Sequence, residues 1–259
     1  MGETEADSKA GVVAGLYRYP VKSLQGQAEH RLEIDEGGVV GDRMWGLVDV
    51  ESGRLASAKR FSALLGGVGH DDSIEIPGGP RVGLGDVDAA DLLSAWLGRK
   101  VRVVRAGESG PLSYQMTFDP PNDDAELFDI PAPEGSLVDL APVHLVTTAT
   151  LDACAARWPQ LNWDVRRFRP NVVVDIDVEP FAENNWVGRD LDVGGAVLRV
   201  DQPTVRCAMP LRAQPGLTAQ PKLFAALNEA NPTMPNHLGL YLGVSHPGSI
   251  NVGDSVTVV

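Results

Sequence analysis

The sequence is poor in cysteine, in positive charge and in long apolar runs. Only two cysteines, Cys154 and Cys207, occur in 259 residues, which excludes a small fold held together by several disulfides. Their spacing does not exclude a disulfide between them, but the lack of a secretory signal favours reduced thiols. No apolar run is long enough to form a membrane-spanning helix.

The first residues lack the features of a targeting segment. Residues 1–10, MGETEADSKA, are polar and acidic. They have neither the basic start and apolar stretch of a secretory signal nor the arginines of an organelle-targeting peptide. We therefore expect a cytoplasmic protein, not bound to a membrane, with a short disordered tail over residues 1–10.

Lysine and arginine total 22 against 35 acidic residues, for a formal net charge of -13. Phosphate groups are repelled by such a surface, so the composition predicts no broad nucleic-acid binding but leaves room for a small basic pocket. The five histidines show no zinc-site spacing. A phosphate-binding loop, a dinucleotide-binding GxGxxG and a GxSxG nucleophile turn are also missing.

Short apolar runs between glycine-containing turns predict a mostly β protein with a few helices, an α+β class built on a barrel or sandwich. The expected strands lie within 11–18, 28–35, 42–50, 54–58, 101–105, 137–150, 166–176, 191–203, 239–244 and 254–259. Helical spacing predicts helices over 86–98, 151–158 and 221–230. Residues 119–136, rich in proline and acid, are expected to form a surface loop or linker.

Both cysteines can be interpreted from their neighbours. Cys154 lies among alanines in the expected helix 151–158, where Thr148 or Thr150 can cap the start, and is interpreted as a small buried hydrophobe. Cys207 follows Arg206, and a nearby positive charge stabilises a thiolate. The residues alone leave Cys207 open as a metal ligand, a nucleophile paired with His144, or an inert core residue.

Basic and polar residues recur at the ends of the expected strands. In an acidic protein they are candidates to converge on one anion, because arginine makes planar two-point contacts and lysine supplies a point charge. The alternative is that they are scattered surface charges in weak pairs. The candidates are Lys22, Ser23, Arg43, Arg169, Asn171 and Arg206.

Six stretches together resemble a known family. They are LYRYPVKSLQG (16–26), GDRMWGLVD (41–49), RFRPNVVV (167–174), PFAENNW (180–186), VRC (205–207) and HPGSINVGDSVTV (246–258). Their order is similar to that of two-domain MOSC proteins, such as the mitochondrial amidoxime-reducing component and its bacterial counterparts. The resemblance implies an N-terminal MOSC β-barrel domain over 11–115 and a MOSC domain over 116–259.

The resemblance also implies a molybdopterin-type molybdenum cofactor. Cys207 matches the position of the protein thiolate on molybdenum, and Arg206 would favour its ionised form. Positions that match the residues holding the pterin and its phosphate are Lys22, Ser23, Arg43, Arg169 and Asn171, with Thr147 and Thr148 as further cofactor contacts. Lys59 stands where relatives often carry an arginine.

The activity implied is the reduction of N-hydroxylated or N-oxygenated small molecules. Electrons would come from a separate donor protein of the ferredoxin or flavoprotein type. Two alternatives on the same scaffold are a sulfur-handling or cofactor-carrier protein that uses Cys207 without redox turnover, and a binding protein without redox chemistry. Residues 208–217 depart from the segment that follows the cysteine in relatives, which bears on substrate specificity.

Overall fold

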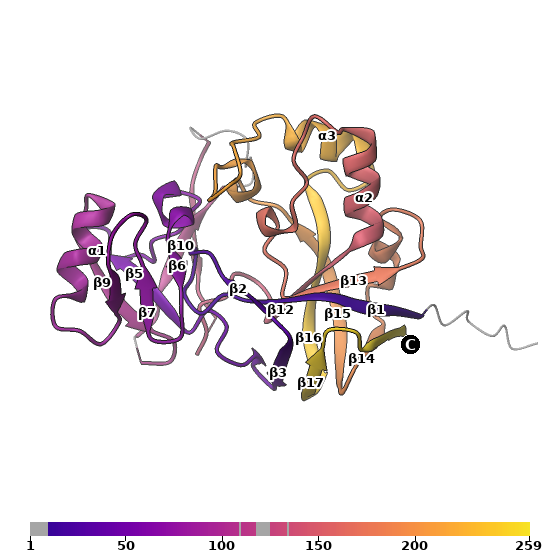
Figure 1. Ribbon diagram of the computed structural model, residues 1–259, viewed down its shortest axis with the longest axis horizontal. Helices are drawn as coiled ribbons and strands as arrows, with labels where there is room; N and C mark the ends of the chain where they lie inside the picture. Colours follow the sequence, from indigo (N-terminus) through magenta and orange to yellow (C-terminus); the bar gives the residue numbers. More distant parts are fainter. Residues whose placement is uncertain (1–9, 109, 118–124, 134) are drawn as a thin grey trace, which may run out of the picture.

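The computed structural model describes residues 10–108, 110–117, 125–133 and 135–259. These form a larger lobe around a closed β-barrel and a smaller lobe of short sheets beside it (Figure 1). A mostly β class is confirmed, with three α-helices in the described part of the chain. The expected tail over 1–10 falls outside the described residues except for Ala10, which begins the first strand.

Seven strands close the barrel in the order β13-β12-β16-β15-β14-β18-β1, because β1 pairs with both β13 and β18. Only β12 and β13 run parallel, and α2 lies between them in the chain. A parallel pair needs such a crossover connection. The barrel strands are β1 (Ala10–Arg18), β12 (Val143–Thr147), β13 (Val172–Ile176), β14 (Asp190–Val193), β15 (Ala196–Val205), β16 (His237–His246) and β18 (Ser255–Val258), and β2 (Gln27–Glu29) extends the sheet beside β1.

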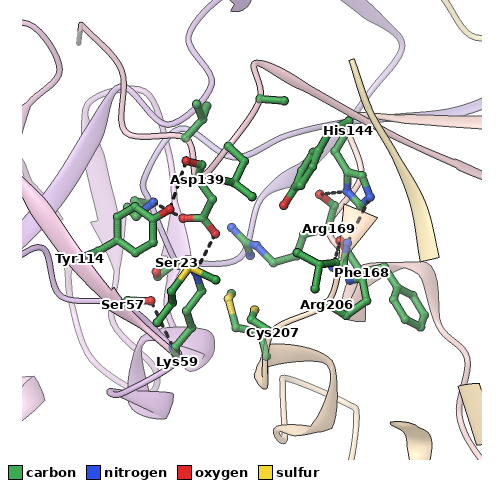
Figure 2. Close-up of a pocket in the computed structure, with 18 of the residues that line it drawn as sticks. Ser23, Ser57, Lys59, Tyr114, Asp139, His144, Phe168, Arg169, Arg206 and Cys207 are labelled. Carbon is green, nitrogen blue, oxygen red and sulfur yellow. Dashed lines mark hydrogen bonds and ion pairs between the residues drawn. The ribbon is translucent and has the colours of Figure 1, made fainter. Parts of the chain in front are cut away.

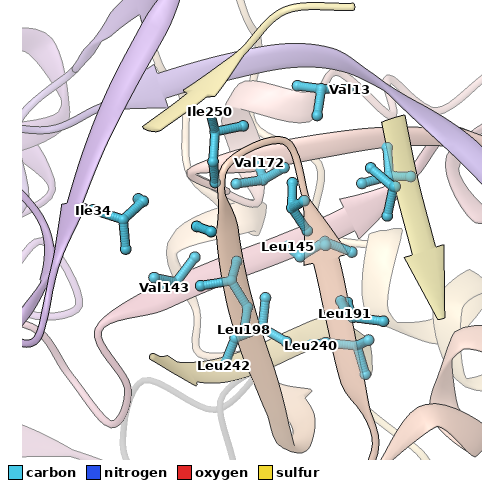
Figure 3. Packing of buried hydrophobic residues seen from close by; sticks show 14 of the residues in the cluster. Val13, Ile34, Val143, Leu145, Val172, Leu191, Leu198, Leu240, Leu242 and Ile250 are labelled. Carbon is cyan, nitrogen blue, oxygen red and sulfur yellow. The ribbon is translucent and has the colours of Figure 1, made fainter. Parts of the chain in front are cut away.

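Aliphatic side chains from every barrel strand fill the interior (Figure 3). Leu198, Leu240 and Leu242 are fully buried there, and truncating one such leucine to alanine costs about 2–5 kcal/mol. A three-stranded sheet adds Leu32, Ile34 and Ile250 to the same core. It consists of β3 (Arg31–Asp35), β4 (Gly38–Val39) and β17 (Gly248–Asn251).

The smaller lobe contains α1 (Ala89–Leu97) and sheets of two or three strands. Its main core includes Leu47, Leu65 and Leu93, and Cys207 packs against it from the larger lobe. The sheets pair β5 (Trp45–Asp49) with β9 (Val101–Arg105), β10 (Ser113–Met116) with β11 (Phe128–Pro131), and β6 (Val68–Gly69) with β7 (Ser73–Glu75) and β8 (Arg81–Gly83).

Two helices cover one side of the barrel, α2 (Thr148–Arg157) and α3 (Leu223–Ala230). They share a core with Cys154, Trp163 and Phe168. Cys154 is buried, as expected from its sequence. No helix in the described ranges combines the length and apolar character needed to span a membrane.

Several expected boundaries are corrected. Residues 54–58 form no strand and contribute one isolated bridge, between Leu55 and Val48. The strand expected over 28–35 is interrupted at His30. Part of the loop expected over 119–136 is strand β11, while residues 118–124 and 134 lie outside the described part. The strand expected from 166 starts at Val172, after a 3-10 turn at Val165–Arg167.

The domain boundary predicted near residue 115 stays a prediction. β1 precedes that boundary, yet it forms part of the closed barrel and contributes Val13 and Leu16 to its core. The smaller lobe therefore lies between β1 and the other barrel strands in the chain.

Candidate functional site

A cavity of about 300 Å³ is lined by residues from both lobes. This volume lies at the lower end of the range for small-molecule sites. The connection between β1 and β2 supplies Lys22 and Ser23, β10 supplies Tyr114, and the end of β15 leads into Arg206 and Cys207. Figure 2 shows Cys207 between a group around Asp139 and a group around Arg169 and Arg206.

The cavity is cationic in an acidic protein. Among the described lining residues, one carboxylate, Asp139, faces five cationic side chains, and the whole chain has a formal net charge of -13. Concentrating positive charge in a partly enclosed cavity raises the local concentration of anions. The five cations are Lys22, Arg43, Lys59, Arg169 and Arg206.

Two lysines on one side of the cavity share Asp139. The Nζ atom of Lys22 lies 2.6 Å from Asp139 Oδ1, and that of Lys59 lies 3.0 Å from Oδ2. Both ammonium groups also lie over the Tyr114 ring, at 4.7 and 4.6 Å from its centroid. We call Lys22, Lys59, Asp139 and Tyr114 the lysine side.

Burial and mutual attraction shift the pKa values of the charged groups on the lysine side. Burial raises the pKa of Asp139, but the two lysines outweigh it and hold that pKa far below its usual range. Burial lowers the pKa of Lys22 despite its contact with Asp139. Burial also opposes the charge of Lys59, but Asp139 and then Cys207 raise its pKa overall.

Arg43 and Arg169 lie on the Tyr19 ring, with their guanidinium carbons 4.9 and 4.2 Å from its centroid. Arg43 is neutralised locally by a salt bridge to Asp42. Burial raises the pKa of Tyr19, so its hydroxyl keeps its proton and donates to the Pro170 carbonyl oxygen at 3.1 Å. Tyr19 therefore holds both guanidinium planes against the cavity wall.

Arg169 and Arg206 form the arginine side, together with His144. Arg169 Nη1 donates to the Leu24 carbonyl oxygen at 2.6 Å, and Arg206 Nη2 donates to the Phe168 carbonyl oxygen at 2.7 Å. No carboxylate of the described residues forms a salt bridge with either arginine. Burial lowers the pKa of Arg169 to about 10 and lowers that of Arg206.

His144 is a neutral hydrogen-bond acceptor for Arg206. Burial and then the Arg206 charge lower its pKa well below the usual value. Its Nδ1 lies 3.3 Å from the Arg169 carbonyl oxygen, and its Nε2 lies 3.2 Å from Arg206 Nη1. The proton therefore belongs on Nδ1, which leaves Nε2 free to accept. Gly239 is required beside it, since a Cβ there would lie 2.7 Å from His144 Nε2.

Two buried nitrogen donors of the arginine side, Arg169 Nη2 and Arg206 Nε, have no hydrogen-bond partner among the described residues. Arg169 and Arg206 are only 6% and 7% exposed. A buried donor left without an acceptor is costly, by about 1–3 kcal/mol and more for a charged group. An anionic ligand in the cavity would supply the missing acceptors.

Backbone strain concentrates around the cavity. Five non-glycine residues in the described chain have positive φ, and all but Phe181 line the cavity. Such conformations cost roughly 1–3 kcal/mol each and persist where the surroundings enforce them, often at functional sites. The four lining residues are Ser23 (71°), Arg43 (48°), Arg169 (55°) and Asn236 (59°).

Cys207 is partly exposed, has no disulfide and lines the cavity. Among the described residues, no three His, Cys, Asp or Glu side chains gather closely enough to hold a metal ion by themselves. A single thiolate suits a soft metal that brings other sulfur ligands with it.

Eight of the ten residues predicted from the sequence line this cavity. Asn171 is held tightly, with its Oδ1 accepting from the His144 backbone N–H at 3.2 Å. The other two do not line it: Thr147 caps α2 by accepting from Thr150 N, and Thr148 donates to Asp175 Oδ1 at 2.9 Å. The helix cap is thus Thr147 rather than Thr148 or Thr150. The eight are Lys22, Ser23, Arg43, Lys59, Arg169, Asn171, Arg206 and Cys207.

The sequence prediction missed Asp139, Tyr114, Ser57, Asn236 and Tyr241, which also line the cavity. Ser57 was visible as the first residue of the Ser-Ala-Lys stretch that ends at Lys59. Asp139 is the one acidic residue of the stretch SLVDLAP (136–142), and no motif around it points to a lysine partner. Tyr114 and Asn236 belong to segments that only the tertiary structure brings to the cavity.

Two family matches now identify the kind of protein. Residues 133–257 match the MOSC domain, and residues 10–66 match the MOSC N-terminal beta barrel domain. The chain belongs to the MOSC family. It is a two-domain MOSC protein, and the MOSC family is linked to the molybdenum cofactor.

Solved structures similar to this MOSC protein are distant from it in sequence. The YUAD protein from Bacillus subtilis is 13% identical, with a TM-score of 0.46 and 97% of each chain covered. YiiM from Geobacillus stearothermophilus is 14% identical, with a TM-score of 0.35, covering 60% of this chain and 74% of that one. YiiM from Escherichia coli is 18% identical, with a TM-score of 0.35, covering 49% and 57%. No curated protein sequence matches the chain.

Proposed function

We propose that this MOSC protein binds a molybdopterin-type molybdenum cofactor in the cavity and reduces N-hydroxylated or N-oxygenated small molecules. Electrons would come from a separate donor protein, of the ferredoxin or flavoprotein type. The observation that carries the proposal is the cationic cavity, where two buried arginine N–H groups lack acceptors beside the partly exposed Cys207.

The residues present fit the cofactor. Arg169 Nη2 and Arg206 Nε would donate to its phosphate oxygens, since charge-assisted bonds from guanidinium to phosphate are among the stronger hydrogen bonds. Lys22 and Lys59 would add positive charge near the same group. Cys207 would bind molybdenum through its sulfur. When bound, the cofactor supplies the two-electron redox chemistry.

Other lining residues are suited to a small organic substrate. Met116, Leu140 and Val205 provide apolar surface on the cavity wall, which would contact the apolar part of a substrate and exclude water. Burial raises the pKa of Tyr241, so its hydroxyl keeps its proton and can donate to a substrate oxygen at neutral pH.

Molybdenum content per chain tests the proposal. Wild type, Cys207→Ala and Cys154→Ala would be purified from a host that makes the cofactor. We expect near-stoichiometric metal in wild type and in Cys154→Ala, because Cys154 is buried in another core, and strong loss in Cys207→Ala. Loaded protein should then reduce a hydroxylamine with a chemical reductant, so that the donor protein need not be known. Folded wild type without molybdenum would overturn the proposal.

The same geometry also supports a sulfur-handling role. A persulfide on Cys207 would carry a negative charge and would lie among the cationic side chains that line the cavity. This role predicts labile sulfur on the Cys207 peptide, detected by mass spectrometry, without reductant-dependent turnover. Turnover that needs both molybdenum and Cys207 would favour the reductase.

A further inference from the structure

Arg167 is the largest fully buried side chain in the described protein, and it does not line the cavity. Its guanidinium donates to three backbone carbonyls of one irregular segment. Nη1 lies 3.1 Å from the Pro210 oxygen and 3.2 Å from the Arg212 oxygen, and Nη2 lies 2.7 Å from the Thr218 oxygen. We call residues 206–218 the Cys207 loop.

A second arginine makes the reverse contact. Arg206, at the start of the Cys207 loop, donates to the carbonyl oxygen of Phe168, which directly follows Arg167. The 3-10 turn Val165–Arg167 and the loop are therefore joined by one arginine from each side. Arg206 N also donates to the Asn236 carbonyl oxygen at 2.7 Å, so Cys207 lies between anchored points.

Hydrogen bonds, and not an ion pair with a described carboxylate, hold the Arg167 guanidinium. No carboxylate of the described residues forms a salt bridge with it, and burial lowers its pKa against the opposing effect of Asp164. Burying an unpaired charge costs several kcal/mol unless hydrogen bonds compensate. Nε also donates to Asn162 Oδ1 at 3.3 Å, which orients the planar fork toward the loop.

We propose that Arg167 is a positioning residue that fixes the Cys207 loop and thereby aims the Cys207 sulfur into the cavity. The backbone hydrogen bonds inside the loop are local, such as Leu211 N to Ala208 O and Gln214 N to Leu217 O, and none of these joins the loop to the 3-10 turn Val165–Arg167. A lysine ammonium places its donors on one nitrogen and cannot reproduce the planar fork that reaches three carbonyls. The consequence for the cofactor rests on the proposed function, whereas the placement of the thiol does not.

Thiol labelling of Arg167→Lys tests the proposal, since this variant keeps the charge and loses the planar fork. Protein would be made in a host without the cofactor and labelled with iodoacetamide, with each cysteine followed by peptide mass spectrometry. We expect Cys207 to be labelled at least about tenfold faster than in wild type, because each charge-assisted hydrogen bond that is lost eases local opening of the loop by about that factor. Cys154, buried in the core beside α2, should be labelled at the wild-type rate.

Matched variants keep the test decisive. Arg157→Lys alters an exposed arginine on α2 that pairs with Glu229 and should leave both rates unchanged. Equal acceleration of both cysteines in Arg167→Lys would mean that Arg167 only holds the fold, and an unchanged Cys207 rate would show that the fork is unnecessary. Either result overturns the proposal.

If Arg167→Lys fails to fold, Asn162→Ala removes the Oδ1 acceptor that orients the guanidinium and that also accepts from the Asp164 backbone N–H. It should accelerate Cys207 alone, in the same direction and by less, and an unchanged Cys207 rate in this variant would overturn the proposal. In a host that makes the cofactor, Arg167→Lys should also retain less molybdenum than Arg157→Lys. If wild type binds no molybdenum, the labelling result still decides the role of Arg167.

Discussion

On the lysine side of the cavity both cations share a carboxylate, whereas on the arginine side neither cation pairs with a carboxylate of the described residues. Asp139 satisfies Lys22 and Lys59 within the protein itself. Arg169 and Arg206 are held by backbone carbonyls and aromatic rings, and each keeps one buried nitrogen without a partner in the described part of the chain. Under the proposed function the two sides therefore have different tasks: the lysine side would add a net positive charge, and the arginine side would donate hydrogen bonds to an anion.

The largest effect should come from removing a cation on the arginine side. Arg169→Gln is expected to weaken binding of an anionic ligand by about 2–3 kcal/mol, or roughly 30- to 150-fold, the range for a hydrogen bond to a charged group. Molybdenum retained after gel filtration and calorimetric titration with inorganic phosphate would measure this loss. Arg166→Gln, which changes an exposed arginine paired with Asp164, is the control. If Arg169→Gln and Arg166→Gln retain equal amounts of molybdenum, the arginine side has no special role in binding an anion.

Asp139→Asn should leave Lys22 and Lys59 without the carboxylate that now pairs with both. Leaving two lysines without their shared counter-ion is expected to cost about 2 kcal/mol of unfolding free energy, less than for a fully buried pair because Asp139 is partly exposed. Phosphate should restore part of this loss in the variant and have less effect on wild type. Urea unfolding with and without phosphate measures both quantities, and a variant as stable as wild type would contradict the expectation.

His144 predicts a pH dependence that belongs to the arginine side. Its pKa is lowered in the folded protein by burial and by Arg206, while the unfolded chain takes up a proton near pH 6.5. Stability from this residue is therefore complete above about pH 6.5 and falls below it, by at most about 1.4 kcal/mol per pH unit. His144→Gln should flatten the curve of unfolding free energy against pH between about pH 6.5 and 5. A wild-type curve already flat there would refute it.

The smallest effect concerns the strained backbone. Asn236 has positive φ, and its carbonyl oxygen accepts from Arg206 N. Asn236→Ala should cost about 1 kcal/mol, because alanine tolerates this conformation less well than asparagine. Asn236→Gly should stay within about 0.5 kcal/mol of wild type, since glycine adopts it without strain. Denaturant midpoints of the pair isolate the backbone contribution, and equal midpoints would show that no strain is stored there.

Much of the arginine side could be predicted from the sequence, because its residues belong to contiguous motifs. Arg169 and Asn171 flank a proline at the entrance to a strand, and Arg206 and Cys207 are neighbours in the chain. The lysine side could be predicted only in part. The sequence predicts Lys22 and Lys59 but not their partners. Asp139 lies 117 residues after Lys22 in the chain, and Tyr114 lies 55 residues after Lys59. No local pattern encodes such a contact.

Arg167 and Arg169 show where motif reasoning stops. Both lie in the same arginine-rich stretch, yet Arg169 lines the cavity and Arg167 is buried against the Cys207 loop. A 3-10 turn ends at Arg167 and Arg169 has positive φ, so the backbone changes direction between them. Thr147 and Thr148 illustrate the same limit, since the cap of α2 accounts for the Thr147 side chain and a hydrogen bond to Asp175 accounts for that of Thr148.

The closure of the barrel has a consequence for how the chain acquires its structure. β1 pairs with β18 and β13, so strands from opposite ends of the described chain lie side by side. Contacts of such sequence separation form slowly, because a long loop must close before they contribute. During synthesis β1 must wait, unpaired with β18, until residues 255–258 emerge. In that interval the edge of β1 that later pairs with β18 stays open and is a site for aggregation.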